Sequence, residues 1–453
     1  HSGIQQQAQG VQLAAFSRRL KCRLEIIRMC RGIRLGKCTP QHIRAARERL
    51  TLRCWGENSV LWYDEATDIF YSSRTTYSPV RELFRFERPD GIESKFYSTF
   101  VLPSGDILFV FDSQFEGGLY TQEQIDAPYS VSIDNIHRRN PIVAVAAEGY
   151  RQHIIDFGDR LKPTGWLQNC GPHYSHRYNA LYFAEYTRAN LRSCNGWKVS
   201  GDIMNPDNWQ VKASRPIDFP YKVGTKHFHT AQEDPYSGAV YFTTGDRNAA
   251  IYASADGENF SQLDKDDRAK WRMLNAVFTK DFMWWASDDW KENHHFWRCS
   301  RADNGIIDPE KIEDLFFFPD FGPGDCKATY GNIYFEKFNA ILFLDRWDGG
   351  YAHYNDLPVY LYDIDTGRMI HLTDMHRREG FDSKSPWGFR CRAMEMHPKG
   401  DRAVVSFDSF HPNNMYMKGN ENGDNLVRNV VLKLKKKGNG SYKLEIKPLS
   451  KNL

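Results

Sequence analysis

A recurring two-strand unit limits what this chain can fold into more than any other feature of its sequence. Each copy consists of a strand, a tight turn and a more apolar strand that ends in an acidic residue. The acids recur on average about every 59 residues. Six clear copies and a looser seventh are present: Phe96 to Asp112, His173 to Glu185, His227 to Asp246, Asn275 to Asp288, Asn332 to Asp345, Phe389 to Asp408, and Val60 to Phe86 for the looser one.

The composition fits a chain built from such units. Hydrophobic residues make up 41% and aromatic residues 14% of the 453 residues, which is enough to bury a large core. From Ser59 onward, short segments rich in Val, Ile, Phe, Tyr and Trp alternate with Gly, Asn, Asp and Pro turns. Seven such units predict an all-β fold, a seven-bladed β-propeller with four strands in each blade, over residues 55–453.

The N-terminal segment has a different pattern. Between Val11 and Arg53, twelve Lys and Arg residues face only two acidic residues, and the apolar residues have near-helical spacing. Thr39 and Pro40 form a helix start signal. We therefore expect residues 1–54 to form a basic helical extension. It either packs on the propeller with a solvated basic face or contacts a partner subunit, an anionic polymer or a membrane surface.

Charge and cysteine content narrow the classes of function. The formal net charge of +3 argues against a nucleic-acid partner, and the apolar runs are too short for a transmembrane segment. Residues His1 to Gly3 are typical of an affinity-tag remnant, so a secretory signal could have been removed. The nine cysteines lack CxxC spacing and predict mostly free thiols, with a Cys170–Cys194 disulfide as the alternative.

One short motif resembles a known family. Ser254-x-Asp256-Gly257-x-x-Phe260 resembles the Asp-box of sialidase-like and other BNR-type propellers. In that family the box closes the turn between the third and fourth strands of a blade. Its aspartate holds the turn and its aromatic residue packs between strands. The resemblance extends in architecture over roughly residues 55 to 450, and it implies a structural role for the box residues.

A propeller brings the start of each innermost strand and the end of each second strand to one mouth of the axis. Here these positions are rich in His, Arg, Tyr and Trp, more than strand ends need for closing loops, and this indicates a binding mouth. The set comprises Tyr97, Gln114, His173, Tyr174, Arg188, His227, His229, Asp246, Arg247, Asn275, Asp288, Asp289, Trp290, Asn332, Arg346, Trp347, Asp348, Arg390, Arg392 and His411.

The chemistry of this mouth favours an acidic polysaccharide or oligosaccharide. Arginines make bidentate contacts to carboxylates, and aromatic faces stack on sugar rings. Ion pairs between blades are the structural alternative for Arg247 and Arg346, and turn capping is the alternative for the aspartates. The predicted substrate-binding residues are His227, Arg247, Arg346, Trp347, Arg390, Arg392, Trp290, Asp289 and Asp348.

The strongest candidates for catalysis are His227 and His229, because strand alternation places both imidazoles on one side. Acid-base or substrate contact, metal ligation and a structural role are the three hypotheses. The residue types are similar to those of propeller-type polysaccharide lyases such as the ulvan lyases, which cleave uronates by β-elimination. This resemblance implies that His229 is the base, Tyr174 or His173 the acid, and Arg247, Arg390 or Arg392 the carboxylate clamp. No cofactor and no catalytic metal are predicted, and a structural divalent ion such as calcium is compatible with the sequence.

Two other classes of function stay open. A sialidase-like hydrolase would use an arginine triad such as Arg247, Arg346 and Arg392, although the early Arg-Ile-Pro element of that family is absent. An inverting hydrolase could use Asp288, Asp289 and Asp348 instead. A non-catalytic propeller would bind a glycan or a protein. We expect a secreted or periplasmic protein, with a cytoplasmic one as the alternative that the odd, scattered cysteines favour.

Overall fold

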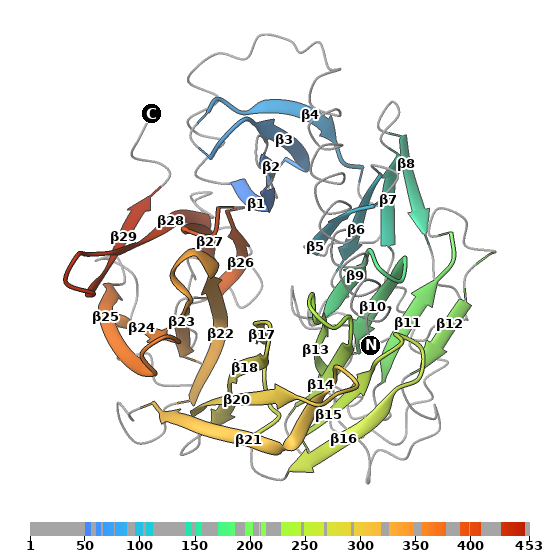
Figure 1. The fold of residues 1–453 in the computed structure, drawn as a ribbon. Helices are drawn as coiled ribbons and strands as arrows, with labels where there is room; N and C mark the ends of the chain where they lie inside the picture. The colour runs from blue at the N-terminus through green and yellow to red at the C-terminus, as the bar shows by residue number, and fades with distance from the viewer. Residues whose placement is uncertain are drawn as a thin grey trace, which may run out of the picture.

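The repeated hairpins form separate antiparallel sheets that stand around a common axis in this computed structural model (Figure 1). The structure describes residues 50–55, 60–64, 67–76, 78–87, 96–102, 106–111, 142–146, 151–155, 171–185, 195–202, 208, 210–213, 228–245, 249–266, 270–290, 294–318, 326–347, 356–376, 390–397, 399–408 and 427–448.

The first four sheets are each built from four consecutive strands, with the innermost strand first. Sheet 1 contains β1 (Leu50–Trp55), β2 (Val60–Asp64), β3 (Ile69–Ser73) and β4 (Arg81–Arg85), and sheet 2 contains β5 (Phe96–Val101), β6 (Ile107–Phe111), β7 (Ile142–Ala146) and β8 (Arg151–Ile155). Sheet 3 contains β9 (Pro172–Ser175), β10 (Ala180–Ala184), β11 (Gly196–Ser200) and β12 (Gln210–Ala213), and sheet 4 contains β13 (Phe228–Glu233), β14 (Val240–Thr244), β15 (Ala249–Ser254) and β16 (Ser261–Asp266).

The remaining three sheets include one exception to the four-strand pattern, because β19 leaves sheet 5 and pairs with β22 of sheet 6. Sheet 5 contains β17 (Val277–Phe278), β18 (Phe282–Ala286), β20 (His295–Arg301) and β21 (Ile307–Phe317). Sheet 6 contains β19 (Asp288–Trp290), β22 (Cys326–Phe335), β23 (Ala340–Trp347), β24 (Asp356–Asp363) and β25 (Arg368–His376), with a 3-10 turn at Glu336–Phe338. Sheet 7 contains β26 (Arg390–Met396), β27 (Arg402–Asp408), β28 (Val427–Lys436) and β29 (Tyr442–Pro448).

The prediction of an all-β propeller is confirmed, and each of the six clear repeat copies supplies the two inner strands of one sheet. Six sheets have the expected four strands, whereas sheet 6 has five. Apolar clusters fill the spaces between neighbouring sheets from sheet 3 round to sheet 1. The ring closes where Leu50 and Leu52 of β1 pack with Val404 of β27 and Val431 of β28.

The first described strand, β1, begins at Leu50, inside the predicted extension of residues 1–54. Leu50 and Leu52 alternate with Thr51 and Arg53, a period of two that places both leucines in the core. The looser repeat copy accordingly covered β2 to β4 and missed the innermost strand of sheet 1. The helices predicted for residues 1–49 lie outside the described residues.

The structure tests part of the membrane and cysteine predictions. Within the described ranges, no helix is long and apolar enough to span a membrane. Cys299 is a free, buried thiol, and burial raises its pKa to about 12. Cys170 and Cys194 lie outside the described residues, so their disulfide stays a prediction.

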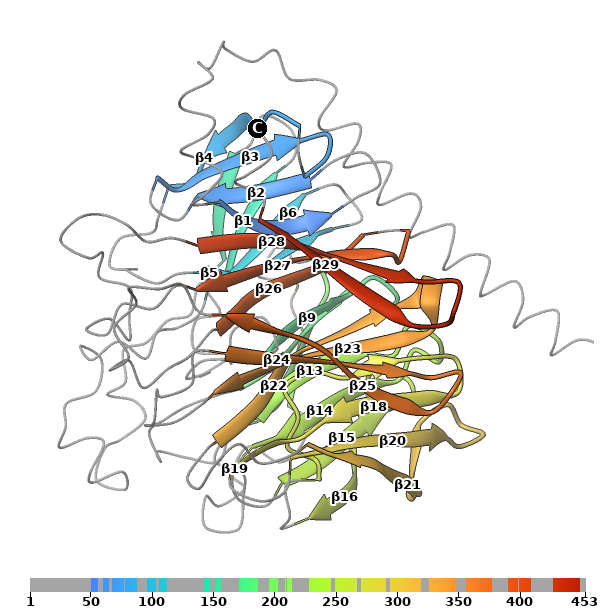
Figure 2. The same ribbon diagram turned by 90° about the vertical axis from the view of Figure 1, so that its left-hand side faces the viewer.

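The two faces of the ring differ in how the strands are connected (Figure 2). On one face, called the turn face here, short turns join first to second and third to fourth strands, as at 234–239 and 302–306. The other face, called the mouth face, receives the ends of the second strands and the starts of the innermost strands. The connections between sheets start and end there, so the predicted mouth residues belong to this face.

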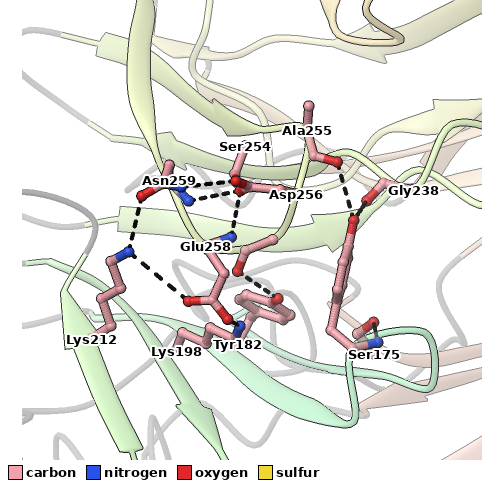
Figure 3. A network of polar contacts seen from close by, with 12 residues as sticks. Ser175, Tyr182, Lys198, Lys212, Gly238, Ser254, Ala255, Asp256, Glu258 and Asn259 are labelled. Carbon is pink, nitrogen blue, oxygen red and sulfur yellow. Dashed lines mark hydrogen bonds and ion pairs between the residues drawn. The ribbon is translucent and has the colours of Figure 1, made fainter.

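The turn between β15 and β16 holds the Asp256 motif on the turn face (Figure 3). Oδ1 of Asp256 accepts hydrogen bonds from Asn259 N, at 2.8 Å, from Ser254 Oγ, at 2.7 Å, and from Glu258 N, at 2.8 Å. These bonds stabilise the carboxylate and hold the pKa of Asp256 well below its usual value. Phe260 packs 5.0 Å from Phe242 between ring centroids. The motif therefore has the predicted place between the third and fourth strands and a structural role.

The same turn fastens sheet 4 to sheet 3. The Tyr182 hydroxyl of β10 donates to the Gly257 carbonyl oxygen over 2.9 Å, and Lys198 of β11 forms an ion pair with Glu258 (Figure 3). Tyr178 donates to the carbonyl oxygens of Gly238 and Ala255, at 2.8 and 3.2 Å. Because sheets 3 and 4 share no strand, these side-chain contacts add to the apolar packing between them.

We predict that Gly257→Ala destabilises the protein more than Gly440→Ala. Both glycines have positive φ, +69° and +81°, but a Cβ at Gly257 would lie 2.6 Å from the Tyr182 hydroxyl oxygen, whereas Gly440 has nothing within 4 Å. The left-handed backbone costs alanine about 1 kcal/mol at either site, and crowding adds roughly 1–3 kcal/mol at Gly257. Guanidinium unfolding midpoints measure the difference, and equal losses would contradict this account of the turn.

Candidate functional site

At the mouth face, a histidine of sheet 4 lies against the aspartate that follows β18 of sheet 5. Nδ1 of His229, at the start of β13, lies 3.7 Å from Oδ2 of Asp288. Both residues are buried, with 3% and 8% of their surfaces exposed. The backbone N–H of Asp288 donates to the carbonyl oxygen of Arg272 over 2.6 Å, and Arg272 is 9% exposed. These three residues therefore share one buried region at the mouth face.

His229 occupies a β-bulge in its strand. Phe228 pairs with Thr244 and Thr230 pairs with Thr243. Because Thr243 and Thr244 are adjacent, His229 has no partner of its own on β14 and is the extra residue of the bulge. A bulge interrupts the regular alternation of side chains and redirects the side chain that it contains, and bulges are common beside active sites. The bulge explains why simple alternation is a poor guide to where this imidazole lies.

The innermost strands of four other sheets contain the same irregularity. In sheets 2, 4 and 7, four paired residues separate the extra residue from the hairpin turn, in sheet 6 five do so, and in sheet 1 only two. The repeat thus places one extra residue at nearly one level of the axis in four sheets. Besides His229, the extra residues are Tyr97 in β5, Tyr330 in β22, Arg392 in β26 and Arg53 in β1.

The structure does not join Tyr174 to this group. The Tyr174 hydroxyl donates to Oδ1 of Asn179 over 2.6 Å, at the turn between β9 and β10. The five residues of β10 separate that turn from Glu185, a length of roughly 17 Å. The carbonyl oxygen of Glu185 accepts from the backbone N–H of Phe228, next to His229, over 2.8 Å. The hydroxyl therefore lies toward the turn face.

His173 also contacts a different part of β13. Its Nε2 lies 3.6 Å from Oε2 of Glu233, and Nε of Arg177 lies 3.5 Å from Oε1 of the same carboxylate. Although burial opposes it, the contacts with His173, Ser175 and Arg177 lower the pKa of Glu233. Glu233 follows His229 by four residues, a rise of roughly 13 Å along the strand. His173 is thus part of a polar contact between sheets 3 and 4 on the way to the turn face.

Several predicted substrate-binding residues are described by backbone position. Asp288 pairs with Ala328, which pairs with Arg346, and Asp289 and Trp347 both pair with Lys327. These four candidates therefore occupy two adjacent rows of sheet 6. Trp290 follows Asp289 on β19 opposite Cys326, and Arg390 lies opposite Asp408. The residues of the predicted mouth that lie outside the described ranges are His227, Arg247, Asp348, Gln114, Arg188, Asp246 and His411.

Other mouth residues have structural contacts. Asn275 Nδ2 donates to the Asn332 carbonyl oxygen over 3.2 Å, and Asn332 Nδ2 donates to that of Asn275 over 3.1 Å, so the two amides join sheets 5 and 6. Oε2 of Glu185 accepts from the backbone N–H of Asn195 and from Nε1 of Trp197, at 2.9 and 3.1 Å. Within the described ranges, no group of three or more His, Cys, Asp or Glu residues is placed to hold a metal ion.

Sequence reasoning missed Arg272 and Tyr330. Arg272 stands between Trp271 and Met273 in an apolar run that links two sheets, and its burial was the missing information. Tyr330 belongs to a strand that extends farther toward the mouth face than the repeat copy indicated. A comparison of strand lengths between the copies could have found Tyr330, whereas Arg272 has no signal in the repeat.

Comparisons with known proteins assign no family to this chain. No family model and no protein of curated function matches the sequence. Among solved structures, a prolyl endopeptidase has a TM-score of 0.49 at 10% identity, over 90% of this chain and 52% of that one. A chain of the mitotic checkpoint complex has 0.45 at 9%, over 79% and 84%. Virginiamycin B lyase from Staphylococcus aureus has 0.43 at 10%, over 80% and 92%. Membership of the sialidase-like family stays a prediction.

We predict that Glu185→Ala costs roughly 2–4 kcal/mol of stability, because the buried Asn195 N–H and Trp197 indole lose their acceptor. Glu185→Gln keeps one acceptor oxygen and should cost less, and thermal or denaturant unfolding compares the two. A wild-type stability for Glu185→Ala would show that this terminal acid does not hold the start of β11.

Proposed function

We propose that the chain is an enzyme that cleaves a uronate-containing acidic polysaccharide by β-elimination at the mouth face. The observation that carries the proposal is the repeated bulge, which gives four innermost strands an extra residue at nearly one level of the axis. Those residues are His229, Tyr97, Tyr330 and Arg392. A base, two phenols and a cation are the groups that this reaction uses.

In the proposed reaction the proton on C5 of the uronate passes to His229. The C5–H electron pair forms the C4–C5 double bond, and the C4–O bond to the leaving sugar breaks. A protonated group returns a proton to the leaving oxygen, so the reaction needs neither oxidant nor cofactor. An arginine that neutralises the substrate carboxylate stabilises the negative charge that develops next to C5.

The contacts of the site support particular roles. Asp288, 3.7 Å from Nδ1 of His229, would orient the imidazole and stabilise its protonated form. Arg392 is the proposed carboxylate clamp, with Arg390 on the same strand and Arg346 on β23 of sheet 6 as further cations, and Arg247 retained from the sequence. Tyr97 and Tyr330 replace Tyr174 and His173 as candidates for the acid, because the latter two have partners toward the turn face.

A non-catalytic glycan- or protein-binding propeller is the second candidate. The observation that favours it is the depth of the His229–Asp288 pair, which joins neighbouring sheets with 3% and 8% of the two surfaces exposed. A buried pair of this kind can serve packing alone. The experiment below separates the two functions, and it also detects a hydrolase.

His229→Ala should lower the rate of elimination at least about 100-fold, the usual contribution of a general base, and leave polysaccharide binding in place. The near-ultraviolet absorbance of the unsaturated uronate product measures the rate on a panel of uronate polysaccharides. His371→Ala, an exposed histidine on β25, is the matched control and should be fully active. New reducing ends without absorbance would point to hydrolysis, and binding without either signal would point to the second candidate.

Tyr97→Phe and Tyr330→Phe test the acid. Each removes one hydroxyl and keeps the ring, so the variant that loses the proton donor should lose about 100-fold or more in kcat with KM changed little. The other variant should stay near wild-type activity. Full activity of both variants would remove the bulged tyrosines from the mechanism.

A further inference from the structure

Three rings and a carboxylate gather on the two outer strands of sheet 5, and the reaction above does not use them. The imidazole of His295 lies 5.2 Å from the Trp297 ring and 4.9 Å from the Phe317 ring, between centroids. Nδ1 of His295 lies 2.8 Å from Oδ2 of Asp314. We call these four residues the sheet 5 strip. It combines three neighbouring rings with a carboxylate that contacts the imidazole.

The strip lies beside the proposed catalytic residues. The backbone N–H of His295 donates to Ser287 Oγ over 2.8 Å, and the Ser287 N–H donates to the His295 carbonyl oxygen over 3.0 Å. Ser287 directly precedes Asp288. β20 begins and β21 ends at the mouth face, so the strip extends outward from Asp288 by about two strand spacings, roughly 10 Å.

Packing accounts for part of the strip and leaves the rest unexplained. Trp297 packs against the apolar cluster between sheets 4 and 5, as a core residue would. Phe317 is 45% exposed, and within the described ranges Tyr236 is the other large hydrophobic residue on the surface, at 41%. Tyr236 has a hydroxyl and a covering guanidinium, with Cζ of Arg301 at 5.7 Å from its ring. Phe317 has no polar group that would justify its exposure.

The polar atoms of the strip suit sugar hydroxyls. The Asp314 side chain is 41% exposed, so its carboxylate can accept hydrogen bonds from a ligand. A pyranose ring presents weakly positive C–H groups to the negative face of an aromatic ring and hydroxyls at its rim. An exposed ring next to a carboxylate matches both features.

We propose that the sheet 5 strip is a sugar-binding subsite of the mouth, in which a pyranose ring stacks on Phe317 and its hydroxyls contact Asp314. It rests on the proposed function in one respect: the ligand is a sugar unit of the same polysaccharide, about 10 Å outward from Asp288. The strip has a carboxylate and no arginine of its own, so it favours a sugar unit without a negative charge at that position.

The test is affinity electrophoresis of the full chain in native gels that contain hyaluronan, in which uronates alternate with uncharged sugars, polygalacturonate, in which every unit is a uronate, or a neutral β-glucan. Phe317→Ala removes an exposed ring and should fold as the wild type does, which circular dichroism checks. We expect the Kd for the retarding polysaccharide to rise about three- to tenfold, the effect of losing one stacking contact. Asp314→Ala is a second variant that leaves all three rings in place, and it should also weaken retardation.

Tyr236→Ala is the matched control, because it removes a ring of similar exposure at the turn face. Its retardation should equal that of the wild type. Equal retardation of the wild type, Phe317→Ala and Asp314→Ala would overturn the subsite, as would a wild type that no gel retards. Selective weakening in the two strip variants supports the subsite whether or not elimination is detected. A supported subsite without unsaturated product would contradict the lyase proposal alone.

Discussion

Apolar packing between neighbouring sheets is the interaction on which the rest of this structure depends. Among the described residues each sheet is made mostly of its own consecutive strands, and strand pairing crosses from one sheet to the next only through β19. Among the same residues, a single backbone hydrogen bond, from Phe228 N–H to the Glu185 carbonyl oxygen, joins sheets 3 and 4. The ring is therefore held mainly by side chains, with Leu50 and Leu52 against Val431 where it closes. Apolar packing fixes the distance between neighbouring sheets, but it is not directional. Polar contacts must therefore fix how neighbouring innermost strands are aligned along the axis.

Those polar contacts lie along the innermost strands and take different forms. The Gln232 amide binds the backbone of Ala276 through both of its polar atoms, at 2.6 and 3.3 Å, and Asn275 and Asn332 exchange hydrogen bonds. Asp288 has contacts with three sheets. It follows β18 of sheet 5, begins β19 in sheet 6 and faces His229 of sheet 4. A carboxylate placed by three sheets is well suited to hold an imidazole in one orientation, as a preorganised site requires.

The sequence predicted the hairpins well, because the alternation of apolar residues and the terminal acid both follow from the packing of an innermost strand pair. It missed β1, because the basic, helix-like pattern that begins at Val11 was read as far as Arg53 and so included the first residues of this strand. It also misplaced Tyr174, because strand alternation gives the side of a sheet and not the height along the axis. The bulges at His229 and Tyr330 could not be located from the sequence, because each is defined by a one-residue shift in the pairing with the second strand, which the residues of the innermost strand alone do not give.

The acidic residue that ends each repeat copy has different contacts in different sheets. Glu185 and Asp288 end equivalent strands, yet Glu185 holds the start of its own third strand, whereas Asp288 faces the neighbouring sheet. The difference follows from the connection, because β11 returns to sheet 3 directly while β19 leaves for sheet 6 before β20 begins. Glu185, in the regular connection, uses its carboxylate for hydrogen bonds within its own sheet. The departure at β19 turns the same acid toward His229, and it brings the start of β20, with His295, beside that pair.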